Sequence, residues 1–145
     1  MNYLSWALLG MVGYSFVTLF VKLAGQHGQI PPFLVLAIST VMAASVAVVI
    51  TISLGDVAAL TGRTLMSPSG LWTLAAGMAL SVAVTALFRA LSLGPASVVV
   101  PVYGMFIVGG SVLSVLFLGE PLTVRKAAGI ALAVISIVLI SGAKR

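Results

Sequence analysis

The sequence predicts an all-α integral membrane protein with five transmembrane helices. Of its 145 residues, 61% are hydrophobic and 6% are charged, and the mean hydropathy is +1.30. Soluble globular domains carry about 25% charged residues, so water is not the expected solvent of most of this chain. The apolar residues also form five runs, each close to the ~20 residues that a helix needs to cross a bilayer. These runs cover residues 3–24, 33–54, 70–92, 97–118 and 124–142.

Short connections with helix-ending and helix-starting residues separate the five runs. The segment GQHGQIPP, residues 25–32, ends the first helix and starts the second. Ser67 is the expected N-cap of the third helix, with Pro68 at its first position, because proline suits the first turn of a helix. Ser97 and Thr123 are the expected caps of the last two helices. Residues 55–70 are numerous enough to lie along the membrane surface, and we expect residues 1–145 to form a single membrane domain.

The two acidic residues, Asp56 and Glu120, both fall in connections between predicted helices. Glu120 lies between Gly119 and Pro121, where the backbone must turn and headgroup water is available. A lone carboxylate at the centre of a bilayer costs several kcal/mol, which favours a position at the membrane edge. We therefore expect Glu120 to pair with Arg125 or Lys126, and we expect no acidic residue within any span.

Polar residues recur at every fourth position in the first and third predicted helices, and side chains four apart share one helix face. Because lipid offers no hydrogen bonds, such rows should face protein or a wet cavity. Two alternatives stay open: Lys22 and Arg89 could reach the headgroups, and the hydroxyls could bond to the preceding helical turn. If the rows do face a cavity, its lining residues are Tyr14, Thr18, Lys22, Ser81, Thr85 and Arg89.

The fourth and fifth predicted helices carry a proline and pairs of small residues. Pro101 leaves one carbonyl without its helical partner, so Pro101, Tyr103 and Gly104 are further candidates for the substrate cavity at a bend. Small residues spaced four apart allow helices to approach closely, either within one chain or between two copies. The residues predicted for such packing or for a dimer interface are Gly110, Ser114, Gly129 and Ala133.

The sequence argues against catalysis, metal binding and cofactor binding. There is no cysteine and only one histidine, His27, which lies in a connection without ligand partners. No nucleophile and base can therefore be placed together, and no glycine pattern for holding phosphates follows a strand. The net charge of +5 lies near the ends of the apolar runs, which favours contact with lipid headgroups and argues against nucleic acid.

The segment ALSLGPASVVVPVYG, followed by LFLGEPLTVRKAAGIALAVISIVLISG, resembles the closing three helices of an EamA-type unit of the drug/metabolite transporter superfamily. Lys22 near the end of the first helix and Pro32 at the start of the second agree more loosely. Two positions depart from the pattern, with Tyr14 where tryptophan is common and Ser39 where arginine is common. The resemblance implies a half-transporter like the short five-helix transporters of bacteria and archaea, with several spans in the inner or plasma membrane.

This resemblance implies a small-molecule transporter with a cavity between two copies and alternating access. Small multidrug exporters of the superfamily hold a cation or proton on a glutamate of the first helix, where this chain has Tyr14, Thr18 and Lys22. A neutral or anionic metabolite is therefore expected, and Lys22 with Arg89 would attract an anionic group. Two alternatives are a non-transporting membrane subunit and one half of a hetero-oligomeric transporter.

Lysine and arginine are distributed almost evenly between the two sides of the predicted topology. The N-terminal side carries three of them (Arg63, Arg125 and Lys126), and the opposite side carries four (Lys22, Arg89, Lys144 and Arg145). Orientation follows the excess of positive charge in short loops, so we expect dual topology. An antiparallel homodimer would then supply the inverted repeats on which larger transporters are built. The alternative is a single orientation with parallel dimers or a monomer, which follows if Lys22 and Arg89 do not count as loop charges.

Dual topology predicts that one engineered cysteine is accessible from outside in only part of the molecules. For Ser69→Cys in intact cells, a membrane-impermeant thiol reagent should label about half of the protein, because the insertion machinery receives little orienting charge. Native protein is the control for background labelling, since it contains no cysteine. Labelling of nearly all or nearly none of the molecules would show a fixed orientation.

Overall fold

A computed structural model describes residues 2–26 and 30–142, apart from the side chains of residues 141 and 142. The described residues form helices and connections and contain no strand, so the predicted all-α class is confirmed. The chain divides into two compact units, Met1–Leu93 and Gly94–Arg145, and each is described by itself. That both units form one membrane domain stays a prediction. His27, Lys144 and Arg145 lie outside the described residues.

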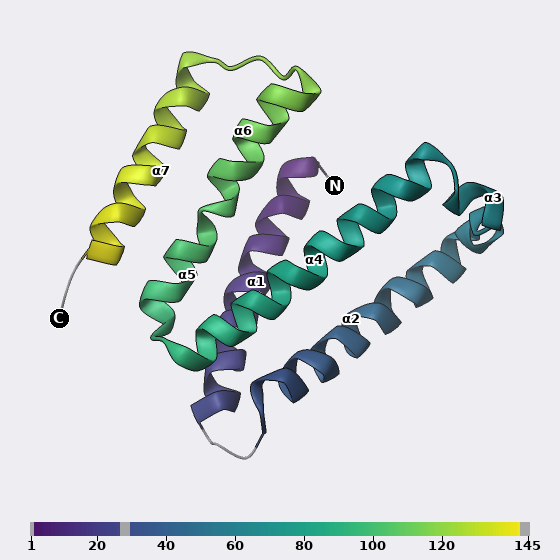
Figure 1. The fold of residues 1–145 in the computed structure, drawn as a ribbon, viewed down its shortest axis with the longest axis horizontal. Coiled ribbons are helices and arrows are strands. Elements are labelled where there is room, and N and C mark those ends of the chain that lie inside the picture. Colours follow the sequence, from purple (N-terminus) through teal and green to yellow (C-terminus); the bar gives the residue numbers. More distant parts are fainter. Residues whose placement is uncertain (1, 27–29, 143–145) are drawn as a thin grey trace. The chain divides into compact units, whose positions relative to one another are not determined.

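The helices follow the predicted runs closely, with small shifts at their ends (Figure 1). The first unit contains α1 (Tyr3–Gln26), α2 (Pro32–Leu54), the 3₁₀ helix η1 (Asp56–Ala59), α3 (Gly62–Leu65) and α4 (Pro68–Leu93). The second unit contains α5 (Ala96–Gly104), α6 (Phe106–Leu118) and α7 (Val124–Gly142).

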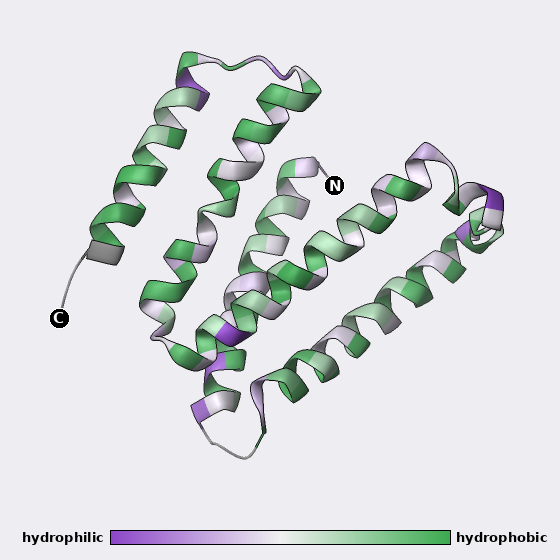
Figure 2. Ribbon diagram, in the orientation of Figure 1, coloured by the Kyte–Doolittle hydropathy of each residue, from purple (hydrophilic) through white to green (hydrophobic). Residues whose placement is uncertain are grey.

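Most of the described surface is apolar, as expected for helices that contact lipid. Figure 2 shows hydrophobic residues along the long helices and hydrophilic ones mainly near helix ends. Among the described residues, only Leu87, Phe88 and Leu91 are buried large hydrophobic residues. Four stretches of the described chain are long and apolar enough to span a membrane: Tyr3–Gln26, Pro32–Leu54, Pro68–Leu93 and Ala96–Leu118. The chain is therefore a multi-pass membrane protein, and the fifth span, over the 19-residue helix α7, stays a prediction.

Within the first unit, α4 packs against both α1 and α2. Its three buried side chains, Leu87, Phe88 and Leu91, lie in its last two turns. The connection between α2 and α4 forms the short helices η1 and α3, which lie at the exposed end of this helix pair (Figure 1). Gly55 ends α2 with φ 77°, a left-handed conformation that glycine adopts without strain.

The predicted cap of α4 is confirmed. The backbone N–H of Gly70 donates a hydrogen bond of 3.2 Å to the Ser67 hydroxyl, and Pro68 is the first helical residue. Gly70 is buried because α4 begins directly against the backbone of α3. A Cβ at position 70 would overlap the carbonyl of Leu65. The tight corner between α3 and α4 thus requires glycine at this position.

The predicted helix over residues 97–118 corresponds to one spanning stretch, Ala96–Leu118, which is interrupted at Met105. The backbone N–H of Met105 donates a hydrogen bond of 3.2 Å to the carbonyl of Val102. This carbonyl lies three residues back, so the turn is tighter than an α-helical one. Pro101, one turn earlier, and Gly104, directly before, both weaken an α-helix here. The expected cap at Ser97 is wrong, because Pro95 takes that place and its carbonyl accepts the N–H of Val98.

The turn between α6 and α7 agrees with the sequence analysis. Lys126 Nζ lies 3.4 Å from Glu120 Oε2, with both side chains about half exposed. The N–H of Lys126 also donates to the Thr123 hydroxyl at 3.3 Å, which confirms Thr123 as the cap of α7. Glu120 is thus an exposed residue of a helix connection, as predicted.

The corner at Gly70 predicts a loss of stability on adding one methyl group. Gly70→Ala should lower the free energy of unfolding by about 1–3 kcal/mol, the usual range for overpacking, because the backbone of α3 must move. The matched control in the same helix is Gly77→Ala, where the new Cβ has no atom within 4 Å. Thermal unfolding of the two purified variants in detergent checks this, and equal melting temperatures would contradict it.

Candidate functional site

A cavity of about 480 Å³ lies among the three long helices of the first unit. We call it the hydroxyl cavity, because all its polar side chains carry hydroxyl groups and the rest of its lining is apolar. These polar side chains are Tyr14 from α1, Ser39 and Thr40 from α2, and Ser81 and Thr85 from α4. The predicted residues Tyr14, Ser81 and Thr85 are thus brought together by the fold.

Hydroxyl groups in this cavity donate to their own helices. Ser39 donates to Val35 O, Thr40 donates to Leu36 O, and Ser81 donates to Gly77 O, each at 2.8 Å. For Ser81, the bonding to the preceding turn that the sequence left open is therefore present. A hydroxyl that donates its hydrogen still has oxygen lone pairs that accept. The cavity wall therefore offers hydrogen-bond acceptors to a ligand that carries N–H or O–H groups.

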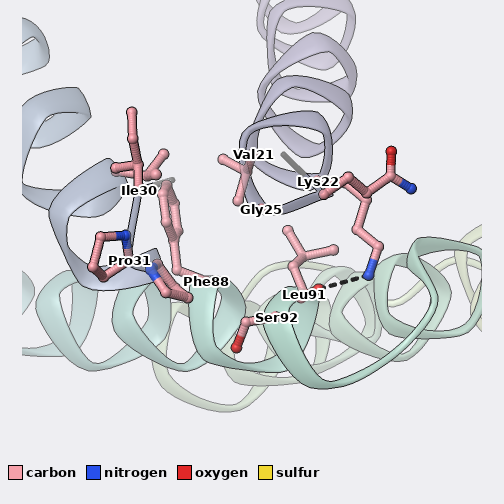
Figure 3. Close-up of a pocket in the computed structure, with 11 residues that line it drawn as sticks. Val21, Lys22, Gly25, Ile30, Pro31, Phe88, Leu91 and Ser92 are labelled. Carbon is pink, nitrogen blue, oxygen red and sulfur yellow. Dashed lines mark hydrogen bonds between the residues drawn. The ribbon is translucent and has the colours of Figure 1, made fainter. Parts of the chain in front are cut away.

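A second cavity, of about 330 Å³, lies where the end of α1, the start of α2 and the end of α4 come together (Figure 3). We call it the Lys22 cavity. Lys22 and Gln26 line it from α1, Pro31 and Pro32 from the start of α2, and Leu91 from α4. Phe88 lines both cavities, so its buried ring is a wall that they share.

The Lys22 ammonium binds the end of a neighbouring helix. Lys22 Nζ donates a 2.9 Å hydrogen bond to the carbonyl oxygen of Leu91, drawn as a dashed line in Figure 3. Leu91 lies in the last turn of α4, whose carbonyl end carries partial negative charge and attracts a cation. Lys22 is half-buried, so this bond fixes its charge inside the unit.

Two predicted residues of the first unit lie outside both cavities. The Thr18 hydroxyl donates to Ser15 O at 2.8 Å. Arg89 is exposed, and its backbone carbonyl accepts the Ser92 hydroxyl at 2.7 Å. Lys22 therefore lines a cavity without Arg89, whereas the sequence analysis paired the two around one mouth.

Residues that the sequence analysis did not assign to the site also line these cavities. Ser39, Thr40 and Phe88 are the clearest cases. The helix that carries Ser39 and Thr40 is apolar on all sides, so no periodic polar row marks its inner face. Phe88 lies next to Arg89 in an apolar run. The sequence alone does not distinguish a phenylalanine that packs against other helices from one that faces lipid.

In the second unit, Gly110, Ser114, Gly129 and Ala133 line one groove of about 600 Å³ between α6 and α7. A Cβ at Gly110 or Gly129 would have no atom within 4 Å. Close approach inside this unit therefore does not require these glycines. Pro101, Tyr103 and Gly104 are half-buried, and none of them lines this groove or the two cavities of the first unit.

The sequence model of the EamA-like transporter family matches residues 1–142. The chain belongs to the EamA-like transporter family. No curated protein and no solved structure gives a significant match. The family match spans all the described helices, and members of this family are transporters. In the part of this EamA-like chain that the structure describes, no group of three His, Cys, Asp or Glu side chains could hold a metal ion.

The bond between Lys22 and Leu91 predicts unequal effects of two charge-removing substitutions. Lys22→Gln should lower the free energy of unfolding by about 1–2 kcal/mol, because a bond from a charged donor is lost. Arg89→Gln is the matched control and should change stability little, because that side chain is exposed. Unfolding by SDS titration in mixed micelles measures both, and an equal loss would contradict a stabilising role for the Lys22 bond.

Proposed function

We propose that this EamA-like protein transports a small neutral or anionic metabolite by alternating access. The observation that supports this most directly is the hydroxyl cavity, whose polar lining in the described chain consists of hydroxyl groups. Such a lining carries no permanent charge, and its hydroxyl groups can hydrogen-bond to a neutral polar solute. Lys22, in the neighbouring cavity, adds a positive charge that favours anionic groups over cations.

The positions of the acidic residues argue against exchange of cations for protons. Glu120 forms an exposed ion pair with Lys126 in the turn before α7. Asp56 begins η1, beyond the end of α2, and is exposed as well. Neither carboxylate lies within a described spanning helix, so neither is placed to carry a proton across the bilayer.

We further propose that the working form is an antiparallel homodimer in the inner or plasma membrane of a bacterium or archaeon. The groove lined by Gly110 and Gly129 supports a second copy, because both glycines face space that a neighbouring helix could fill. The even distribution of positive charge supports insertion in both orientations. No enzymatic activity, cofactor or nucleic-acid partner belongs to this proposal.

Two functions are the alternatives to this proposal. One is a non-transporting membrane subunit, and the other is one half of a hetero-oligomeric transporter. Flux by the purified protein alone in liposomes separates them from the proposal. Only a self-sufficient transporter moves solute without a second kind of chain. A panel of labelled amino acids, sugars and monocarboxylates, tested by counterflow, is suited to find the substrate.

The hydroxyl cavity predicts a position-specific effect of removing one hydroxyl group. With the substrate found by counterflow, Ser81→Ala should lower the initial rate of uptake into liposomes about fivefold or more, because one acceptor is lost from the cavity wall. Ser45→Ala is the matched control, since Ser45 makes the same bond to its preceding turn and lies outside the described cavities. Equal rates for the two variants would contradict the assigned cavity.

The same uptake assay tests the role of Glu120. Glu120→Gln should transport like the native protein, because an exposed ion pair contributes little and the side chain lies outside both cavities of the first unit. Resistance of cells to toxic lipophilic cations that disappears in Glu120→Gln would overturn the choice of a neutral or anionic solute.

A further inference from the structure

The connection between α2 and α4 carries exposed apolar side chains at one face of the membrane. Both helices are long and apolar enough to span, so the residues that join them lie where the two spans end. In this connection, Leu60 is 71% exposed and Met66 is 87% exposed. Apolar side chains are more stable at the boundary between headgroups and acyl chains than in water. The connection is therefore suited to contact phospholipid.

A groove of about 500 Å³ lies at the same place, where the end of α2, the short helices η1 and α3, and the start of α4 meet. Figure 1 shows this corner beside the label of α3. We call the groove the corner groove. Its walls are mainly apolar, with Val48 and Ile52 from α2, Val57 from η1 and Leu60 directly after η1. Because Gly70 places α4 directly against the backbone of α3, the corner is held in position before any ligand binds.

The polar groups of this corner include one negative and one positive side chain. Asp56 lines the corner groove, and Arg63 lies on α3, with both side chains exposed. Among the described residues, neither of them has an ion-pair partner in the protein. Thr64 and Ser69 add hydroxyl groups to the lining, and a hydroxyl can both donate and accept a hydrogen bond. An occupant with a cation, an anion and an apolar chain would match all of these groups.

We propose that the corner groove binds a membrane phospholipid whose headgroup ends in a primary ammonium, as in phosphatidylethanolamine. The ammonium donates hydrogen bonds to the Asp56 carboxylate, and the acyl chain next to the glycerol contacts Val48 and Ile52. Arg63 attracts the phosphate of the same headgroup. This inference is independent of the proposed transport function, since the corner groove shares no lining residue with the hydroxyl cavity or the Lys22 cavity.

The lining favours this headgroup over two others. Phosphatidylcholine has the same charges, but its trimethylated nitrogen has no N–H group to donate to the Asp56 carboxylate. Phosphatidylglycerol has no cation at all, so its negative charge would meet the negative charge of Asp56 without compensation. A primary ammonium has three N–H donors and a full positive charge, and both properties suit a carboxylate. Asp56 is thus the residue that sets the preference among lipids.

Competition between two lipids for the purified protein tests the proposal. The protein in detergent receives equal amounts of phosphatidylethanolamine and phosphatidylcholine with identical acyl chains, and native mass spectrometry measures how much of each stays bound. We expect about two to five times as much bound phosphatidylethanolamine, the preference that one exposed pair of opposite charges implies. Equal amounts of the two lipids would show a nonspecific lipid contact and overturn the proposal.

Three variants sharpen this measurement. Asp56→Asn should remove the preference, because its amide carries no charge, whereas Asp56→Glu should keep it. Glu120→Gln is the matched control, because Glu120 is an exposed carboxylate of another connection and already pairs with Lys126. This control should bind the two lipids in the same ratio as the native protein. A preference that persists in Asp56→Asn, or that disappears in Glu120→Gln, would contradict the role of Asp56.

A further measurement uses the native chain and does not depend on how well a variant folds. Phosphatidylethanolamine with a photoactivatable group near the glycerol end of one acyl chain is added to the protein in phosphatidylcholine nanodiscs, and mass spectrometry locates the crosslinks. Adducts should concentrate at residues 48–60 and 69–73 and decrease when unlabelled phosphatidylethanolamine is added. Adducts spread evenly along α1, α2 and α4 would overturn the site. Flux does not enter this measurement, so such a result would leave the transport proposal standing.

Discussion

The absence of hydrogen-bonding partners in lipid is the constraint on which this structure depends. Every backbone amide and every hydroxyl in a spanning helix needs a partner supplied by the protein or by a water-filled cavity. The described serine and threonine hydroxyls within the long helices repeatedly solve this by donating to the preceding turn. Ser15, Thr51 and Ser53 do so on surfaces exposed to the surroundings, at 2.8–2.9 Å. The same bonds in the hydroxyl cavity leave acceptor oxygens for a solute.

Lys22 combines this need for hydrogen-bond partners with a positive charge. Its long side chain satisfies part of its hydrogen-bonding capacity on Leu91 O, in the last turn of α4. Residues near a helix end have carbonyl groups without intrahelical partners, so this is where a cation from another helix is most easily held. The bond ties α1 to α4 beside a cavity.

The predictable features of this fold are local ones. The positions of the spans follow from runs of apolar residues, and Ser67, Thr123 and the Glu120 pair follow from chemistry within one or two helical turns. The interruption at Met105 did not follow, because Pro101 predicts a weak place and not the residue at which the turn tightens. Ser97 failed as a cap because the extended backbone of Pro95 already ends the preceding segment.

The sequence by itself determined the solvent, the helical class, the family resemblance and the location of both acidic residues outside the spans, since each depends on composition or on neighbours along the chain. Only the tertiary structure decided which polar residues share a cavity. Lys22 and Leu91 are 69 positions apart, and Ser39 belongs to a helix whose faces look alike in sequence. Packing of α4 against α1 and α2 selects one face of each helix, and that selection brought Tyr14, Ser39 and Ser81 together while leaving Arg89 outside.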